Sequence, residues 1–160
     1  MPEMKVRVAA RWVGKSAKIP EVVYVAIFLP PMESARLVKK FGKTHPTFLA
    51  KHMTIWFHED GSKLDLVNMP FGKTIPLKIV GHGENDRVQV VVVKPPAGFK
   101  PKAGRVPHIT MSLAPGASAK ESNALLANPE NIVWEQGLLT VEGKLGWWDG
   151  ERERFDSPNG

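Results

Sequence analysis

The chain has 160 residues, with 22 lysines and arginines against 16 aspartates and glutamates, and a formal charge of +6. This length suits one domain with its own core, and the positive charge favours an anionic partner such as RNA, although a solvated basic surface would give the same balance. The chain contains no cysteine, which excludes a disulfide framework, a thiolate nucleophile and a zinc site of the cysteine type.

The N-terminal third of the sequence predicts two strands and a helix. Residues 4–13 alternate basic and apolar side chains, which indicates an edge strand or an ordered arm. Residues 22–29 are apolar on both faces, as in a buried central strand, and within them Tyr24 is either a buried ring or a substrate contact. Residues 33–41 carry an apolar stripe at helical spacing, and Gly42 ends this helix.

The next predicted strand begins at His52, and its apolar positions alternate with polar ones. Alternation places His52, Thr54 and Trp56 on one face, while the residues between them point into a core. His45 and His58 lie nearby in the sequence, but no acidic residue stands at a ligand-like interval within the strand. We therefore expect no metal site here.

The middle of the chain predicts short strands and a basic loop. Residues 64–67 form one strand candidate, and residues 74–80 pair with residues 87–94 as a hairpin around a polar turn. Residues 95–107 are rich in proline, glycine and lysine. This loop is either a basic lid that gathers a phosphate backbone or an ordinary surface loop.

A second strand of the first kind begins at His108. The alternation there places His108, Thr110 and Ser112 on one face and apolar residues on the other. Ser118 and Glu121 then fit a capping box, which predicts a helix that a following Asn-Pro sequence ends.

The C-terminal part predicts closing strands at residues 132–134 and 138–145. The tryptophans that follow, Trp147 and Trp148, form either a hydrophobic lid on the core or a stacking platform for a nucleobase. Residues 151–160 are charged, and we expect this tail to be disordered.

The two histidine strands carry the chemistry of the sequence. A histidine near its ordinary pKa of about 6.5 takes or gives a proton at neutral pH, so two that face one substrate can do both. A threonine hydroxyl beside each can donate to a non-bridging phosphate oxygen. This pattern favours phosphodiester cleavage without a metal, and it leaves open which histidine is the acid. The candidate catalytic residues are His52, Thr54, His108 and Thr110, and the candidate substrate-binding residues are Tyr24, Lys51, Trp56, Ser112 and Trp147.

A tandem pair of His-x-Thr strands in a small basic chain resembles the 2H phosphoesterase superfamily, which includes the LigT-like RNA cyclic phosphodiesterases. The segments at residues 106–110 and 120–123 are more narrowly similar to the cyclic phosphodiesterase domains of fungal tRNA ligases. The broader resemblance spans about residues 22–148. It implies an α+β fold, with one two-lobed domain in residues 1–150, antiparallel sheets flanking a central cleft and helices packed outside.

The resemblance also implies a function. We expect a phosphodiesterase without cofactor or metal, acting on RNA or nucleotide phosphodiesters, with 2′,3′-cyclic phosphates as the expected substrates. Two alternatives stay open: an enzyme that cleaves cyclic oligonucleotide immune signals, as in phage anti-defence, and an RNA-binding module without catalysis. The second is disfavoured, because a binder needs charge and stacking but no proton shuttle.

The cellular setting follows from what the sequence lacks. No apolar run approaches the roughly 20 residues of a membrane span, and residues 1–20 lack the apolar middle of a secretion signal. We therefore expect a cytoplasmic protein that does not bind membranes. The sequence does not fix the oligomeric state, and we expect a monomer.

Overall fold

The computed structural model describes residues 21–57, 68–99 and 105–158, except the side chains at 57 and 136–138. The strands expected at residues 4–13 and 64–67 lie outside these ranges. The elements are β1 (Tyr24–Phe28), α1 (Pro31–Phe41), β2 (Thr47–Phe48), β3 (His52–Phe57), β4 (Thr74–Glu84), β5 (Val88–Val93), β6 (His108–Leu113), α2 (Glu121–Leu126), the 3-10 helix η2 (Pro129–Asn131), β7 (Val133–Trp148) and β8 (Glu153–Arg154).

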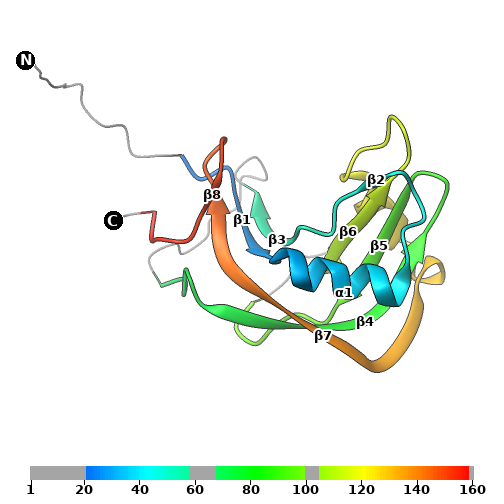
Figure 1. Cartoon of the computed structure of the whole chain (residues 1–160), viewed down its shortest axis with the longest axis horizontal. Helices are drawn as coiled ribbons and strands as arrows, with labels where there is room; N and C mark the ends of the chain where they lie inside the picture. Colours follow the sequence, from blue (N-terminus) through cyan, green and yellow to red (C-terminus); the bar gives the residue numbers. More distant parts are fainter. Residues whose placement is uncertain (1–20, 58–67, 100–104, 159–160) are drawn as a thin grey trace, which may run out of the picture.

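The strands form one closed antiparallel ring. Their order is β1-β3-β6-β5-β4-β7, and β7 pairs back with β1 to close a six-stranded barrel (Figure 1). The short strands β2 and β8 pair with β6 and β7. The expected antiparallel sheet in one small domain is confirmed. The expected division into two lobes is not confirmed, because the strands close into a single ring.

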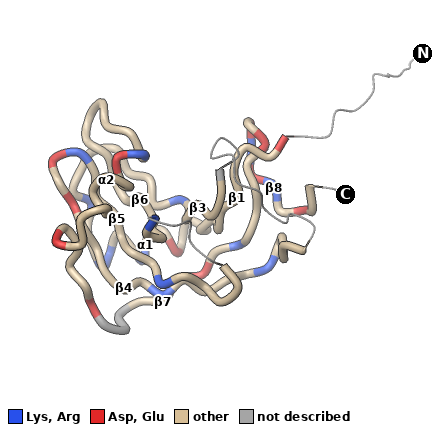
Figure 2. Tube along the Cα trace, turned by 180° about the vertical axis from the view of Figure 1, so that it is seen from behind, with Lys and Arg blue, Asp and Glu red and all other residues tan. Residues whose placement is uncertain are grey.

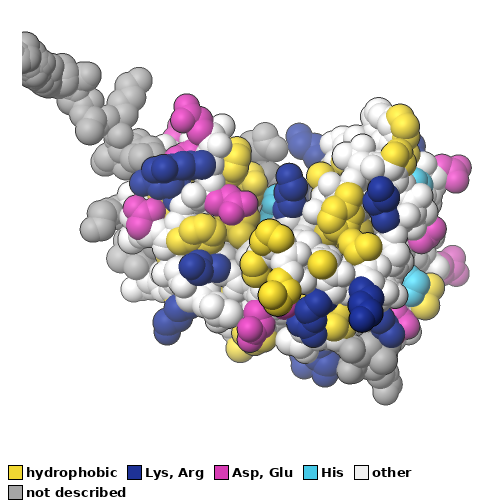
Figure 3. All heavy atoms as spheres, viewed as in Figure 1, with side chains coloured by type: hydrophobic (Ala, Val, Ile, Leu, Met, Phe, Trp, Pro, Cys, Tyr) yellow, Lys and Arg dark blue, Asp and Glu magenta, His cyan; other side chains and the backbone are white. Residues whose placement is uncertain are grey.

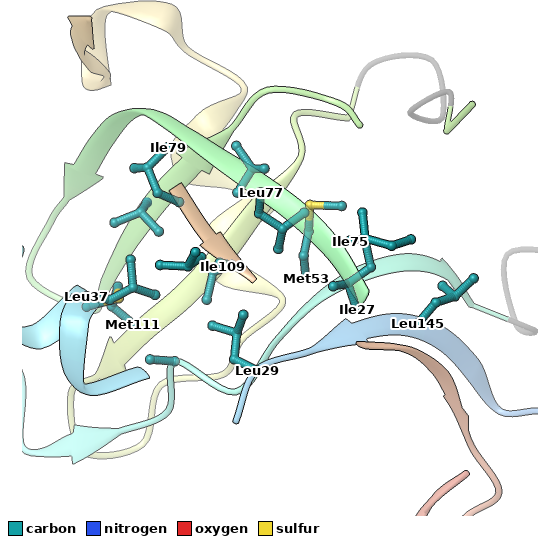
Figure 4. Packing of buried hydrophobic residues seen from close by; sticks show 14 of the residues in the cluster. Ile27, Leu29, Leu37, Met53, Ile75, Leu77, Ile79, Ile109, Met111 and Leu145 are labelled. Atoms are coloured by element: carbon teal, nitrogen blue, oxygen red, sulfur yellow. The ribbon is translucent and has the colours of Figure 1, made fainter. Parts of the chain in front are cut away.

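The inward faces of the ring form the main core. Alternating positions of β4 are buried, as expected for a strand with one face inside. α1 adds Leu37, which is fully buried and contributes about 2 kcal/mol through the hydrophobic effect. Figure 4 shows these side chains pointing toward one another, among them Ile27, Leu37, Met53, Leu77, Ile109 and Leu145.

A second, smaller core lies on the outer face of β5. Val88, Val90 and Val92 point away from the main core and pack against Leu125 and Leu126 of α2. β5 is therefore buried on both faces, which agrees with its nearly continuous run of valines. The hairpin of β4 and β5 is confirmed.

β7 is one long strand where the sequence predicts two. Gly143 does not interrupt it but lets β7 approach β1, since a Cβ at this position would lie 2.9 Å from the Phe28 carbonyl oxygen. Among the described residues, neither helix is long and apolar enough to cross a membrane.

The expected disorder of residues 151–160 is wrong for the part that the structure describes. β8 pairs with the end of β7, and the Trp147 Nε1 donates a hydrogen bond of 2.8 Å to the Asp156 carbonyl oxygen. Phe155 packs edge-on against Phe28, with ring centroids 5.8 Å apart. The pairing of β8, the Trp147 bond and the Phe155 ring together anchor this segment to the barrel.

Candidate active site

The two His-x-Thr motifs meet where β3 and β6 pair. The two strands are antiparallel, and their register places Met53 opposite Ile109. One residue forward along β3 is therefore one residue back along β6, so His52 lies opposite Thr110 and the other histidine lies opposite the other threonine. Met53 and Ile109 are buried in the core. The motif side chains consequently share the outer face, and the structure brings all four together.

The first motif lies in the middle of the molecule. Figures 1 and 2 place β3 between the part of the ring that carries β5 and β6 and the part that carries β1 and β8. The site is thus flanked by α2 on the side of β5, and on the other side by the aromatic residues of β1 and β7 and by Phe155, which follows β8.

A residue with a strained backbone conformation lies just before the first motif. Ala50 has a φ of 48°, in the left-handed region that costs a residue with a side chain about 1 kcal/mol or more. Its amide donates to the Thr110 carbonyl oxygen, and its own carbonyl accepts a 2.6 Å hydrogen bond from the Ser34 hydroxyl. These bonds hold the turn through which the chain leaves β2 and enters β3 at His52.

A backbone carbonyl just before β6 holds the imidazole of His108. Its Nδ1 lies 2.8 Å from the Val106 carbonyl oxygen. A carbonyl oxygen can only accept, so Nδ1 carries a proton, and Nε2 of the neutral ring is an acceptor. Burial lowers the pKa of His108; the bond to Val106 opposes this shift, and the charge of Arg105 adds to it.

His52 lies among aromatic rings. The centroid of Tyr24 is 5.2 Å away and that of Phe28 is 5.6 Å away. Burial is the main cause that lowers the pKa of His52 to about 4, and the charges of His108 and Lys51 add to the shift. The ring is therefore neutral at pH 7 and able to accept a proton.

Ser122 is a site residue that the sequence analysis did not identify. Its side chain is fully buried on α2, and its Oγ lies 2.9 Å from the Thr110 Oγ1. When Ser122 donates in this bond, the Thr110 proton is left for a ligand. The only sequence signal was its position in the segment that resembles tRNA ligases.

A β-bulge changes the expected face of Trp56. Ala26 pairs with Thr54 but Val25 pairs with Trp56, so Ile55 is an extra residue in β3. Because Val25 is fully buried in the core, Trp56 points to the core face and packs against the main core. The expectation that it shares a face with the first motif therefore fails at the bulge.

The side chains of two other candidate binding residues already form hydrogen bonds inside the protein. Ser112 is fully buried; its hydroxyl donates to the Gln89 Oε1 at 2.6 Å and accepts from the His45 amide at 3.1 Å. Trp147 is also fully buried, and its indole nitrogen bonds to the Asp156 carbonyl oxygen. We leave both residues out of the proposed site.

Tyr24 and Lys51, by contrast, lie beside His52. Tyr24 is partly buried and stacks on Trp148, with ring centroids 6.1 Å apart and planes at 14°. Trp148 was not predicted as the site tryptophan, although neighbouring residues of a strand point to opposite faces and one of the two had to lie here. Lys51 is exposed.

The remaining histidines contact other parts of the fold. The His45 Nε2 lies 2.8 Å from the Asn85 carbonyl oxygen, and the His82 Nε2 lies 3.4 Å from a Glu135 carboxylate oxygen. In the described ranges, no three histidine or acidic side chains are grouped as metal ligands. His58 lies outside these ranges.

Comparison with known proteins gives a fold but no family. No family model matches the chain, and no curated protein matches it. Among solved structures, the crystal structure of a fungal RNA kinase matches with a TM-score of 0.54 and 14% identity over 82% of this chain. The match covers 46% of that chain, so this chain spans about half of its length. At this identity the likeness shows a shared fold alone.

Proposed function

We propose that the protein is a metal-independent phosphodiesterase of RNA or nucleotide phosphodiesters, with 2′,3′-cyclic phosphates as its main substrates. The observation that carries the proposal is the β3–β6 register, which sets two histidines and two threonines on one face. Packing does not explain this combination, since buried imidazole and hydroxyl groups cost free energy unless they form hydrogen bonds. One imidazole that accepts a proton and one that donates a proton, beside two hydroxyl donors, suit a reaction that moves protons around a charged phosphate.

The reaction is an in-line displacement at phosphorus. His52 takes a proton from water, the water oxygen forms a bond to phosphorus, and the bond to the leaving ribose oxygen breaks. His108, which solvent has protonated on Nε2 before the step, gives that proton to this oxygen, so a cyclic diester becomes a monoester. Solvent then removes the proton from His52 and returns one to His108. The low pKa of His52, about 4, favours it as the acceptor, while the Val106 carbonyl supports the protonated form of His108.

The threonines hold the phosphate during this step. A hydroxyl that is already oriented donates to a developing charge without reorganising, which is worth a few kcal/mol of barrier. Thr110 is anchored by Ser122 at 2.9 Å. We expect Thr54→Val and Thr110→Val to slow the reaction clearly, but by less than the loss of either histidine.

The test uses a chelator and a panel of cyclic phosphates. His52→Ala and His108→Ala should each lower turnover by at least about a hundredfold, the lower scale of general acid–base catalysis, with the circular dichroism spectrum unchanged. His45→Ala is the matched control, because this histidine lies outside the motifs and should leave turnover unchanged. Near-native turnover in either motif variant would exclude the mechanism.

The same panel separates the alternatives. Cleavage of a 3′,5′-linked cyclic dinucleotide, with no cleavage of nucleoside 2′,3′-cyclic phosphates, would indicate an enzyme that degrades cyclic oligonucleotide signals. Retention of RNA on a filter without any product, with an affinity that falls steeply with salt, would indicate a binding module instead.

A further inference from the structure

A groove of about 700 Å³ lies between α1 and β8, next to the candidate active site. Its walls are mostly apolar, and two charged side chains line it as well. Figure 3 shows this face, with apolar side chains gathered in its middle and lysine and arginine side chains around them. The lining includes Leu29, Ala35, Val38, Phe48, Lys51 and Glu153.

The two charged residues are available to a ligand. Within the described ranges, neither the Lys51 nor the Glu153 side chain makes an ion pair or a hydrogen bond. The Ser34 hydroxyl, which also lines the groove, is already bonded to the Ala50 carbonyl. The polar recognition in this groove therefore depends on one ammonium group and one carboxylate.

The charged residues also connect the groove to the site. Lys51 directly precedes His52, and its charge acts on that imidazole. Glu153 pairs with Trp148, and Trp148 pairs in turn with Tyr24, whose ring lies 5.2 Å from His52. A strand of RNA bound at the histidines would meet Lys51 and Glu153 as it leaves them.

We propose that this groove is a subsite for the nucleotide on the 5′ side of the reacting nucleotide, so that the preferred substrate is an RNA strand rather than a free mononucleotide. This inference rests on the proposed function. The base lies against the apolar wall, and Lys51 binds the phosphate that links the two nucleotides. Glu153 accepts a hydrogen bond from an amino group of the base. The groove volume lies within the usual range of small-molecule sites, about 300–1,000 Å³.

The experiment compares kcat/KM for adenosine 2′,3′-cyclic phosphate with kcat/KM for a trinucleotide that ends in the same group. The wild type should prefer the trinucleotide by about tenfold or more, the scale of one base contact. Ala35→Glu should reduce this ratio to about one, because a carboxylate would enter the groove and repel phosphate. Met32→Glu is the matched control, since Met32 is exposed on α1, takes the same charge and does not line the groove.

A second pair of variants guards against a folding defect in Ala35→Glu. Lys51→Gln should lower the trinucleotide preference and flatten its salt dependence by about one phosphate contact. Lys39→Gln removes the same charge from an exposed α1 position outside the groove and should do neither.

Each outcome decides a different question. Equal kcat/KM values for the two substrates in the wild type, or an unchanged ratio in Ala35→Glu, would overturn the subsite and leave the proposed function standing. If the wild type cleaves neither substrate, the proposed function fails. The groove is then tested by binding of a fluorescent trinucleotide 3′-phosphate, which Ala35→Glu should weaken and Met32→Glu should not; equal binding by both variants overturns the subsite.

Discussion

The protonation of His52 should make the stability of the protein depend on pH. In the unfolded chain a histidine has a pKa of about 6.5, whereas in the folded protein the pKa of His52 is about 4. Between these values the unfolded state binds a proton that the folded state does not, so the protein loses stability as the pH falls from 6.5 to 4. At 1.36 kcal/mol per unit of pKa, the loss from this residue is about 3 kcal/mol.

Urea unfolding from pH 7 to pH 4 measures this effect. His52→Gln should show a pH dependence weaker by about 3 kcal/mol over that range, and His45→Gln should behave as the wild type does. An NMR titration of the imidazole gives the pKa directly. Tyr24→Ala should raise it, because the ring that shields His52 from water is gone. A titration midpoint near 6.5 in the wild type, or equal pH dependence with and without His52, would refute the reasoning.

Further predictions concern the neighbourhood of the site. Ser122→Ala should lower turnover about two- to tenfold, the worth of one hydrogen bond, and should have no further effect in a Thr110→Val background. Ser112→Ala, the buried-serine control, should lower the Tm and leave turnover unchanged. Gly143→Ala should destabilise the protein by about 2 kcal/mol or more in urea unfolding, because its Cβ would lie 2.9 Å from a β1 carbonyl oxygen. Trp147→Ala should cost about 3–5 kcal/mol of stability without changing KM, and a raised KM would return this residue to the site.

Local patterns were enough to predict many of the elements. The valine run of β5, the alternation of β3 and β6 and the apolar stripe of α1 are properties of consecutive residues, so they are readable without the fold. The same holds for each motif by itself: alternation placed His108 and Thr110 on one face of their own strand. Which strand would lie beside β6 could not be predicted, because it depends on pairing between strands that are far apart in the sequence.

What the sequence did not reveal depends on contacts between distant segments. The bulge at Ile55 reverses the face of Trp56, and no local pattern marks it. Alternation placed Ser112 on the motif face and gave no role to Ser122, yet Ser122 bonds to Thr110 while Ser112 bonds to Gln89. Likewise, the choice between Trp147 and Trp148 is made by the register of β7 against β1.

The Met53–Ile109 pair has a further consequence for the direction of the reaction. An antiparallel pair has a local twofold axis perpendicular to the sheet, and rotation about it exchanges the two motifs. A phosphate on this axis meets the same two groups, an imidazole and a hydroxyl, from either side. The two motifs alone therefore do not determine from which side the water attacks and on which side the ribose oxygen leaves. The direction is set by the different surroundings of the two histidines: aromatic rings lie beside His52, and the Val106 carbonyl lies beside His108. Changes to those neighbours, with both motifs intact, should decide which ribose oxygen leaves.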